Sequence, residues 1–484
     1  MSKSLKIIES EQGGACAHRP ELHVAQSVRG LKPGSFRGRA AVVTLGCAKN
    51  QVDSEVMLGS LLQSGFEIVN DPAKADVAIV NTCGFLESAV KESLDSILEL
   101  AAFKKSGQLR KLIVAGCVVE RYKDDIKRNL PEVDAFLAVD DILKAGSVAA
   151  GEAGEVLLSA ARPYFLYDDS MPRHLSTRSH SAYVKISDGC DRPCAFCTIP
   201  AIRGKLRSRE FDSLVREVEA LARGGVREIN LIAQDLTAYG TDTKSASLCA
   251  LLRRLDRERF VDWVRLLYSY PLGIDDELLD CINELPTVCE YLDLPLQHSS
   301  ERILKAMRRP LGKFSPRRLV EFIKSRAPGI HLRTTFIAGF PGEKESDVDD
   351  LESFIREGYF SSVGVFTYSR EEGTPAAAMP GQVAQAVKDA RYQRLMVAQQ
   401  EVNQKALLEC VGREFEALVD GPHEETELLW TARTRFQAPE VDGTVIVNDA
   451  AAGLESLSTG RMVRLVISQS AGYDLIGTIT RVVS

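Results

Sequence analysis

The stretch Cys190-Asp-Arg-Pro-Cys194-Ala-Phe-Cys197 decides how the chain is interpreted, and it directly follows the apolar segment 182–186. Three thiolates from one loop can bind three irons of a cubane cluster and leave the fourth iron without a protein ligand. The alternative is zinc, which usually takes four ligands in paired C-x2-C units. Neither a second pair nor a nearby His completes such a site in this sequence. The spacing therefore favours a 4Fe–4S cluster with one open position.

This C-x3-C-x2-C spacing resembles the cluster loop of the radical S-adenosylmethionine (SAM) enzymes. The resemblance implies that SAM binds the open iron through its amino and carboxylate groups. It also implies reductive cleavage of SAM to a 5′-deoxyadenosyl radical, a reagent that the cofactor supplies and the protein aims. On this resemblance we expect Cys190, Cys194 and Cys197 to be catalytic and cluster-binding residues.

A second set of cysteines follows short apolar, β-branched runs: Cys47 after residues 41–46, Cys83 after 77–82 and Cys117 after 112–116. Such runs, each followed by a helix-like segment, are typical of a parallel α/β sheet. The carboxyl ends of parallel strands share one edge, so we expect these thiols to converge there and bind a second 4Fe–4S cluster. The alternative is three small core residues, because cysteine is among the most buried residue types.

Together the two cysteine sets resemble the methylthiotransferases, which carry a SAM-cleaving cluster and an auxiliary cluster, from about residue 40 to the C-terminus. Local strings resemble the branch that modifies the β-carbon of an aspartate in ribosomal protein S-twelve. They are LGCAKNQVDSE (45–55), DGCDRPC (188–194), IPAIRG (199–204), QDLTAYG (234–240) and LPLQHS (294–299). The sister branch modifies an adenosine beside the tRNA anticodon and is the alternative function.

The resemblance also implies the partners and the cofactor use of such a transferase. SAM serves both as methyl donor and as radical source, beside two 4Fe–4S clusters. The expected partners are ribosomal protein S-twelve, free or in the small subunit, an electron donor such as flavodoxin, and a sulfur donor. No specific nucleic acid is expected. For this chemistry the cluster of Cys47, Cys83 and Cys117 must face the site of Cys190.

The resemblance places SAM contacts in two segments, 228–234 and 337–343, which give Gln234, Gly339 and Glu343 as expected cofactor-binding residues. The glycines of the second segment would let backbone approach the adenine, although they are equally typical of turns. His298 is either a site residue or a hydrogen-bonded structural histidine. The basic run Arg203, Lys205, Arg207 and Arg209 is expected to be a solvated face, with anion binding as the alternative.

The length of 484 residues predicts about three domains. We expect a disordered extension (1–39), a flavodoxin-like domain with the auxiliary cluster (40–150) and a linker (151–180). An incomplete (βα)6 radical SAM barrel (181–411) and a small five-stranded antiparallel β-barrel, identified by resemblance as a TRAM domain (412–484), follow. A helix over 383–410 is expected to strap these last two domains together.

Charge and composition bear on the partner and the compartment. The segment 412–484 carries six Arg and eleven Asp or Glu, a net charge of −5. An RNA-binding surface should be basic, so this acidic barrel favours a basic protein partner. The sequence contains no run of 18 apolar residues and no charged-then-apolar N-terminus. We therefore expect that the chain has no membrane span and no signal peptide. Thiolate ligands fit a reducing cytoplasm.

Overall fold

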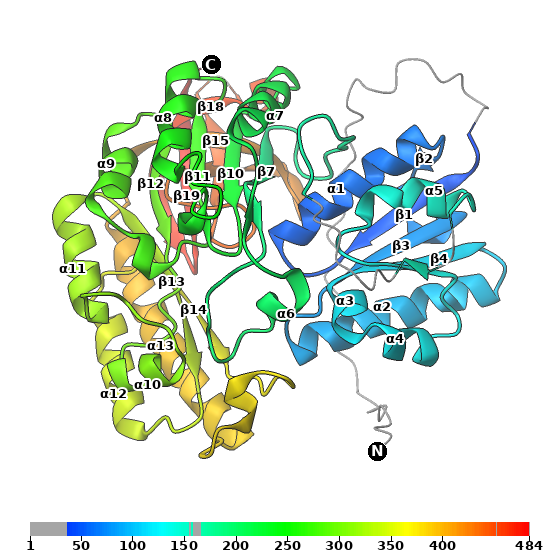
Figure 1. Ribbon diagram of the computed structural model, residues 1–484. Coiled ribbons are helices and arrows are strands. Elements are labelled where there is room, and N and C mark those ends of the chain that lie inside the picture. Colours follow the sequence, from blue (N-terminus) through cyan, green and yellow to red (C-terminus); the bar gives the residue numbers. More distant parts are fainter. Residues whose placement is uncertain (1–35, 154–155, 158–165, 452, 484) are drawn as a thin grey trace.

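The computed structural model describes residues 36–153, 156–157, 166–451 and 453–483. Three parts follow one another along the chain: an α/β domain, a βα half-barrel and a small closed β-barrel (Figure 1). The predicted fold class is confirmed. The extension up to residue 35 and residues 154–155 and 158–165 of the expected linker lie outside the described residues. Within the described part, none of the helices combines the length and apolar character needed to span a membrane.

The first domain is a parallel sheet in the order β2-β1-β3-β4-β5-β6, in which the first five strands have the flavodoxin-like order. Its strands are β1 (Arg39–Thr44), β2 (Glu67–Ile68), β3 (Val77–Thr82), β4 (Lys111–Gly116), β5 (Ala135–Leu137) and β6 (Val156–Leu157). Its helices are α1 (Ala48–Gln63), α2 (Glu87–Lys105), α3 (Cys117–Tyr122), α4 (Asp124–Asn129) and α5 (Ala145–Ala149). Strand β3 is buried throughout, which explains its continuous apolar run. Strand β6 comes from the segment expected to be a linker.

The half-barrel has six parallel strands in the order β7-β10-β11-β12-β13-β14, and its sheet does not close. The strands are β7 (Ser181–Lys185), β10 (Glu228–Ile232), β11 (Trp263–Leu266), β12 (Val288–Asp293), β13 (His331–Ala338) and β14 (Ser362–Thr367). The helices are α7 (Phe211–Arg223), α8 (Leu248–Glu258), α9 (Asp276–Glu284), α10 (Glu301–Ala306), α11 (Pro316–Arg326) and α12 (Glu345–Arg356). Between β7 and α7 lie α6 (Ile199–Arg203) and the antiparallel pair β8 (Ser187–Asp188) and β9 (Arg207–Ser208).

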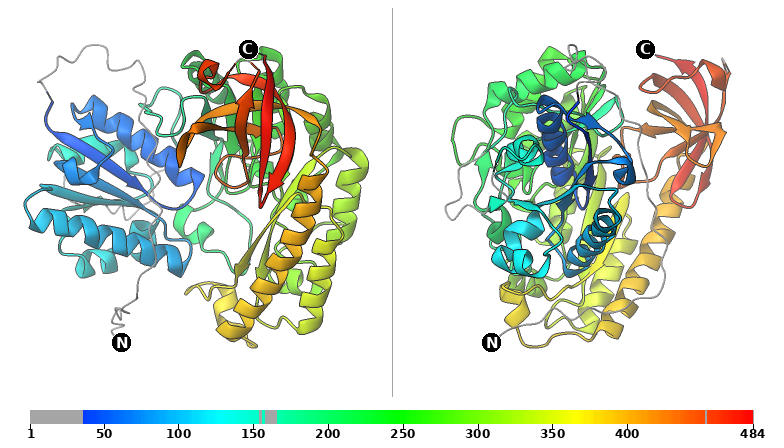
Figure 2. Two further views of the ribbon diagram at one scale, coloured as in Figure 1. Left: turned by 180° about the vertical axis from the view of Figure 1, so that it is seen from behind. Right: turned by 90° about the vertical axis from the view of Figure 1, so that its right-hand side faces the viewer.

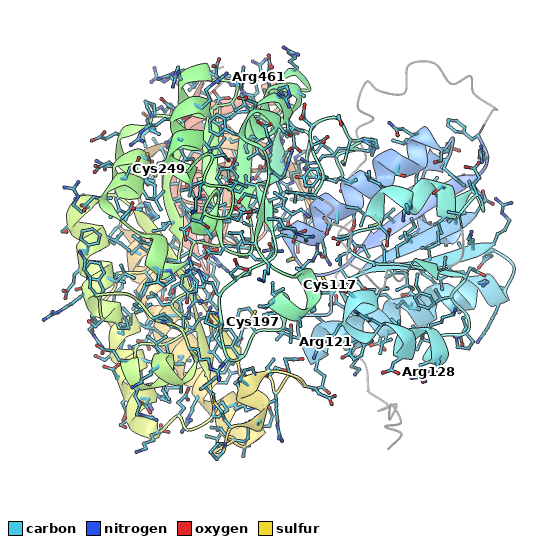
Figure 3. The ribbon with its side chains drawn as sticks, in the orientation of Figure 1. Cys117, Arg121, Arg128, Cys197, Cys249 and Arg461 are labelled. Atoms are coloured by element: carbon cyan, nitrogen blue, oxygen red, sulfur yellow. The ribbon has the colours of Figure 1, made fainter. Side chains whose placement is uncertain are left out.

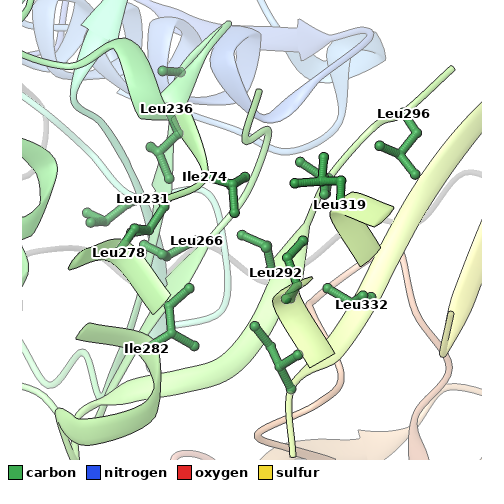
Figure 4. Close-up of a cluster of buried hydrophobic side chains, with 14 of the residues drawn as sticks. Leu231, Leu236, Leu266, Ile274, Leu278, Ile282, Leu292, Leu296, Leu319 and Leu332 are labelled. Carbon is green, nitrogen blue, oxygen red and sulfur yellow. The ribbon is translucent and has the colours of Figure 1, made fainter. Parts of the chain in front are cut away.

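The core of the half-barrel lies between the strands and their outer helices. Leucines of neighbouring strands, Leu231, Leu266, Leu292 and Leu332, pack with apolar side chains of α9 and α11 (Figure 4). Each of these four leucines is at most 1% exposed, and complete burial of such a side chain contributes about 2 kcal/mol. This rigid wall fixes the carboxyl ends of the strands, where a barrel of this kind places its site.

The C-terminal barrel closes in the order β15-β16-β17-β19-β18. Its strands are β15 (Glu414–His423), β16 (Thr426–Thr434), β17 (Val445–Ala450), β18 (Met462–Ala471) and β19 (Asp474–Val482). Four of the five strand pairs are antiparallel, whereas β17 and β19 pair in parallel, which differs from the wholly antiparallel barrel expected. Figure 2 shows α13 (Gln385–Leu408) running along the half-barrel and leading into this domain, as predicted for the strap helix.

A buried ionic network joins the C-terminal barrel to the start of the half-barrel strands. Glu228 at the beginning of β10 pairs with Arg265 (3.0 Å) and with Arg433 of β16 (2.7 Å). Arg433 also pairs with Asp420 at 2.7 Å, and Asp420 in turn contacts His180 at 2.8 Å. Burial raises the pKa of Glu228, but Arg433 and Arg265 outweigh this effect and lower the pKa to about 2. The two domains are therefore locked together by charge as well as by α13.

Candidate functional site

The loop of Cys190, Cys194 and Cys197 leaves the carboxyl end of β7 through the short strand β8. Its thiols lie close enough together that each ionised neighbour disfavours ionisation of the next. Burial, reinforced by these neighbours, raises the pKa of Cys190 to about 11 and that of Cys197 to about 12. The free thiols of Cys190 and Cys197 therefore stay protonated at neutral pH, and a bound cation is needed to hold these two as thiolates.

The thiols of Cys47, Cys83 and Cys117 follow β1, β3 and β4, which are adjacent in the sheet. Neighbouring glycines let these turns approach one another. A Cβ added to Gly46 would lie 2.9 Å from Sγ of Cys83, and one added to Gly84 would lie 2.8 Å from the backbone carbon of Cys117. Close packing thus requires glycine beside these cysteines. The three strand ends lie next to one another, as expected.

The electrostatics of this second set differ from cysteine to cysteine. Burial, together with ionised Cys117 and Cys47, raises the pKa of Cys83 to about 11. Burial also raises the pKa of the Cys47 thiol, but Lys49, the backbone N–H of Asn50 and Arg203 outweigh it, so that the pKa falls below the ordinary value. As whole residues, Cys47 is exposed, Cys83 is half-buried and Cys117 is buried.

Each cysteine set supplies three thiols, the number that a 4Fe–4S cluster with one open iron takes from a protein. Among the described residues, no group of three His, Cys, Asp or Glu side chains converges as ligands of one metal ion do. In a cubane each thiolate binds a different iron, so its sulfurs stand farther apart than the ligands of zinc. Backbone N–H groups also point at the sulfurs, as near iron–sulfur clusters: that of Arg192 lies 3.4 Å from Sγ of Cys190.

Arg203 connects the two cysteine sets. It ends α6, which directly follows the Cys197 loop, and its Nη2 lies 3.4 Å from Sγ of Cys117 and 2.7 Å from Oδ1 of Asn50. The helices α3 and α6, which carry Cys117 and Arg203, contact each other, and Figure 3 shows Cys117 and Cys197 at the junction of the first domain and the half-barrel. Cys117 therefore lies next to the segment that follows the Cys197 loop.

The same guanidinium belongs to a buried ionic cluster across the domain junction. Nη1 of Arg203 lies 2.7 Å from Asp53 of α1 and 3.3 Å from Asp188 of β8. Lys185 of β7 lies 2.5 Å from Asp53 and 3.0 Å from Asp188. All four side chains are less than a tenth exposed. Two acids and two bases balance here, which lets the charges remain buried.

The basic run 203–209 is not the solvated face that we expected. Arg203, Arg207 and Arg209 are buried, and only Lys205 is exposed. Arg207 pairs with Asp140 of the first domain at 3.4 Å, and Arg209 pairs with Glu217 of α7. Carboxylates and a cysteine sulfur surround these cations, because residues of the first domain cover Arg203 and Arg207 and helix α7 covers Arg209.

Gln234 lies at the end of β10, beside this ionic cluster. Its Nε2 donates to Oδ1 of Asp188 at 2.8 Å, while its Oε1 has no hydrogen-bond partner among the described residues. Ser269, after β11, likewise has a buried Oγ without a described partner. Unpaired buried polar atoms are rare in folded proteins, so both oxygens are available to a polar ligand. Glu228, at the other end of the same segment, faces the C-terminal barrel instead.

Gly339 and Glu343 are joined by hydrogen bonds. The backbone N–H of Gly339 donates to both carboxylate oxygens of Glu343 at 2.9 Å, and Glu343 also pairs with Arg391 (2.9 Å) and His298 (3.4 Å). A Cβ on Gly339 would lie 2.4 Å from the Lys388 side chain. These contacts give both residues a structural role in shaping the loop after β13, and His298 is part of the same arrangement.

Three residues of the site have no signal in the sequence pattern: Lys49, Tyr268 and Arg309. Nη1 of Arg309 lies 3.6 Å from Sγ of Cys194, and Nζ of Lys49 lies 3.1 Å from the centroid of the Tyr268 ring. Tyr268 has φ 66°, a left-handed conformation that costs free energy in a residue with a Cβ and often marks a functional site. A single sequence does not reveal such contacts, since they join segments far apart in the chain.

Comparison with known families and proteins gives matches over nearly the whole chain. Residues 39–138 match the Uncharacterized protein family UPF0004, residues 184–355 the Radical SAM superfamily and residues 411–480 the TRAM domain. The ribosomal protein uS12 methylthiotransferase RimO of Syntrophotalea carbinolica is 46% identical over 91% of this chain and 96% of its own length. The protein of that name from Geobacter sulfurreducens is 46% identical over 91% of this chain and 98% of its own length.

Among solved structures, the fold is similar to the radical SAM methyltransferase TsrM from Kitasatospora setae, in a structure with cobalamin and a 4Fe–4S cluster bound. The TM-score is 0.51 at 17% identity, over 70% of this chain and 76% of that one. At this identity the similarity concerns the fold alone.

Proposed function

Since this chain belongs to the RimO family of ribosomal protein uS12 methylthiotransferases, we propose that it adds a methylthio group to the β-carbon of an aspartate in uS12, the S-twelve protein of the small subunit. It is a radical SAM transferase that transfers sulfur. The observation that carries the proposal is the contact between Arg203 and Cys117, since it joins the segment after one cysteine loop to a cysteine of the other set.

The cysteines divide between two cluster sites in this proposal. Cys190, Cys194 and Cys197 bind the cluster that holds SAM, and Cys47, Cys83 and Cys117 bind an auxiliary cluster. Gln234 contributes to the SAM site through its free Oε1, and Gly339 with Glu343 shapes the adjoining loop. When bound, SAM and the two clusters supply the 5′-deoxyadenosyl radical and the methylthio sulfur. An electron donor such as flavodoxin and a sulfur donor complete the requirements.

The side chains of the junction orient the two sites and exclude water between them. Asp53 and Asp188 are neutralised by Lys185 and Arg203, so the junction stays dry without a net charge. Arg203 and Arg309 each direct an N–H at a cysteine sulfur. Such hydrogen bonds and the positive charge stabilise the reduced form of an iron–sulfur cluster.

The test is mass spectrometry of uS12 and of bulk tRNA from cells with and without the gene. The expected result is loss of one methylthio mass increment from a single aspartyl peptide of uS12, with tRNA unchanged. Loss of methylthioadenosine from tRNA with uS12 unchanged would instead assign the chain to tRNA modification. No change in either molecule would contradict both functions.

A further inference from the structure

One buried cation of the site has no carboxylate partner. The Lys49 side chain is 7% exposed, yet no carboxylate forms an ion pair with it anywhere in the part of the chain that the structure describes. Lys185 and Arg203, two other buried cations of this junction, are both paired with carboxylates. Within the chain, Lys49 acts on the thiol of Cys47, whose pKa it lowers. A buried charge is stable when it is paired, so Lys49 is placed to bind a carboxylate from outside the chain.

The position of Lys49 is fixed from both domains. It lies in the first turn of α1, two residues after Cys47, and its ammonium rests 3.1 Å from the centroid of the Tyr268 ring of the half-barrel. Cation–π contact stabilises the ammonium without neutralising it. Tyr268 keeps its left-handed backbone (φ 66°) because Asp293 accepts its N–H at 2.9 Å. Gln297, after the neighbouring strand β12, is strained in the same way (φ 77°).

The segment that holds Lys49 also reaches the other cysteine set. Tyr270, two residues after Tyr268, carries the Arg309 guanidinium 4.3 Å from its ring centroid, and Arg309 points at Cys194. Ser269, between the two tyrosines, has a buried Oγ without a described partner. An anion bound by Lys49 would therefore lie between Cys47 and the site of Cys194.

We propose that the Lys49 ammonium, held over the Tyr268 ring, binds the carboxylate of the aspartate to be modified. The carboxyl carbon of aspartate is bonded directly to the β-carbon, so fixing the carboxylate fixes the carbon at which the reaction occurs. This inference rests on the proposed function and adds the residue that selects an acidic side chain. An asparagine or a nucleobase offers no carboxylate and would leave Lys49 unpaired.

The experiment measures binding of fluorescently labelled recombinant uS12 to the anaerobically reconstituted holoenzyme, without SAM turnover. A second uS12 sample has the target aspartate, identified by its mass increment, replaced by asparagine. Wild-type enzyme is expected to bind the aspartate form about tenfold or more tightly than the asparagine form, as for a charge-assisted hydrogen bond. Lys49→Met and Lys49→Gln should abolish this preference, and Lys49→Arg should restore most of it.

The matched control is Lys127→Met, which removes an exposed lysine of α4 in the same domain and should leave the preference unchanged. Equal iron content and circular dichroism of the variants show that they fold. A preference that survives in both neutral variants overturns the inference. So does a loss of SAM affinity in them with the uS12 preference intact, which would assign the carboxylate to SAM. Failure of the proposed function differs, because wild-type enzyme would then leave uS12 without a methylthio increment.

Discussion

Nη2 of Arg203 lies 3.4 Å from Sγ of Cys117, although 86 residues separate them in the sequence. Arg203 ends the short helix that follows the Cys197 loop, so one guanidinium links the two candidate cluster sites. Arg309 holds an equivalent position at the other site, with Nη1 at 3.6 Å from Sγ of Cys194. Each site thus has its own cation beside a cysteine sulfur, and the two can be perturbed separately.

Removal of these cations should shift the two cluster potentials one at a time. Hydrogen bonds to the sulfurs and nearby positive charge stabilise the reduced cluster. Arg203→Met should therefore lower the potential of the auxiliary cluster and leave the SAM cluster unchanged, and Arg309→Met should do the reverse. Redox titration followed by electron paramagnetic resonance measures both. Equal shifts of both clusters in either variant would contradict separate tuning.

The cysteine assignment predicts the iron content of two triple variants. Replacement of Cys47, Cys83 and Cys117 by alanine should leave about four irons per chain, those of the SAM-binding cluster. The corresponding triple variant of the 190–197 loop should also keep about four. Replacement of the buried Cys249 and Cys281, on α8 and α9 away from both sets, is the control and should leave the iron content unchanged. Iron and sulfide assays decide, and a variant of the first set that keeps full iron would refute an auxiliary cluster there.

The position of these cysteines could be predicted from the sequence, since apolar runs that end in Cys47, Cys83 and Cys117 indicate adjacent parallel strands. The fold class followed from the same periodicity. The burial of Arg203, Arg207 and Arg209 could not, because a basic run is typical of a solvated surface. Docking of the first domain covers Arg203 and Arg207, and Glu217 of α7 covers Arg209. The pairing of Glu228 with Arg433 of the C-terminal barrel could not be predicted from the sequence either, because it depends on how separate domains pack.

Glu371 forms a second connection between the first domain and the half-barrel. Its carboxylate accepts hydrogen bonds from Nη2 of Arg121 (2.8 Å) and from the backbone N–H of Glu87 at the start of α2 (2.9 Å), and its side chain is 2% exposed. Glu371→Gln keeps the shape and removes the charge, which should weaken this contact by about 1–3 kcal/mol. Hydrogen–deuterium exchange is then expected to accelerate at the start of α2.

The control for this variant is Asp125→Asn, which removes the acid of a surface ion pair with Arg128. Exposed pairs contribute at most about 1 kcal/mol, so exchange at α2 should not change in it. Unchanged exchange in Glu371→Gln would mean that the remaining contacts between the domains, among them the Arg203 cluster and the Arg207–Asp140 pair, are sufficient without it.

Acid should weaken the packing of the half-barrel on the C-terminal barrel through His331. Its ring stacks on Phe436 with centroids 4.4 Å apart, and burial together with Lys324 and Arg413 lowers the pKa of His331 to about 4. The unfolded chain binds a proton near pH 6.5, whereas the folded protein does not until about pH 4, so stability falls as the pH decreases through this window.

The cost at pH 5.5 amounts to about 1 kcal/mol relative to pH 7.5. His331→Phe keeps an aromatic ring against Phe436 and has no proton to bind, so its stability should fall by about 1 kcal/mol less between these two values. Urea unfolding of both proteins at pH 7.5, 6.5 and 5.5 measures the difference. The other buried histidine whose pKa burial lowers, His174, is present in both proteins and cancels. An identical pH dependence of the two proteins would mean that His331 has the same pKa in the folded and the unfolded protein, and that its ring reaches solvent at this interface.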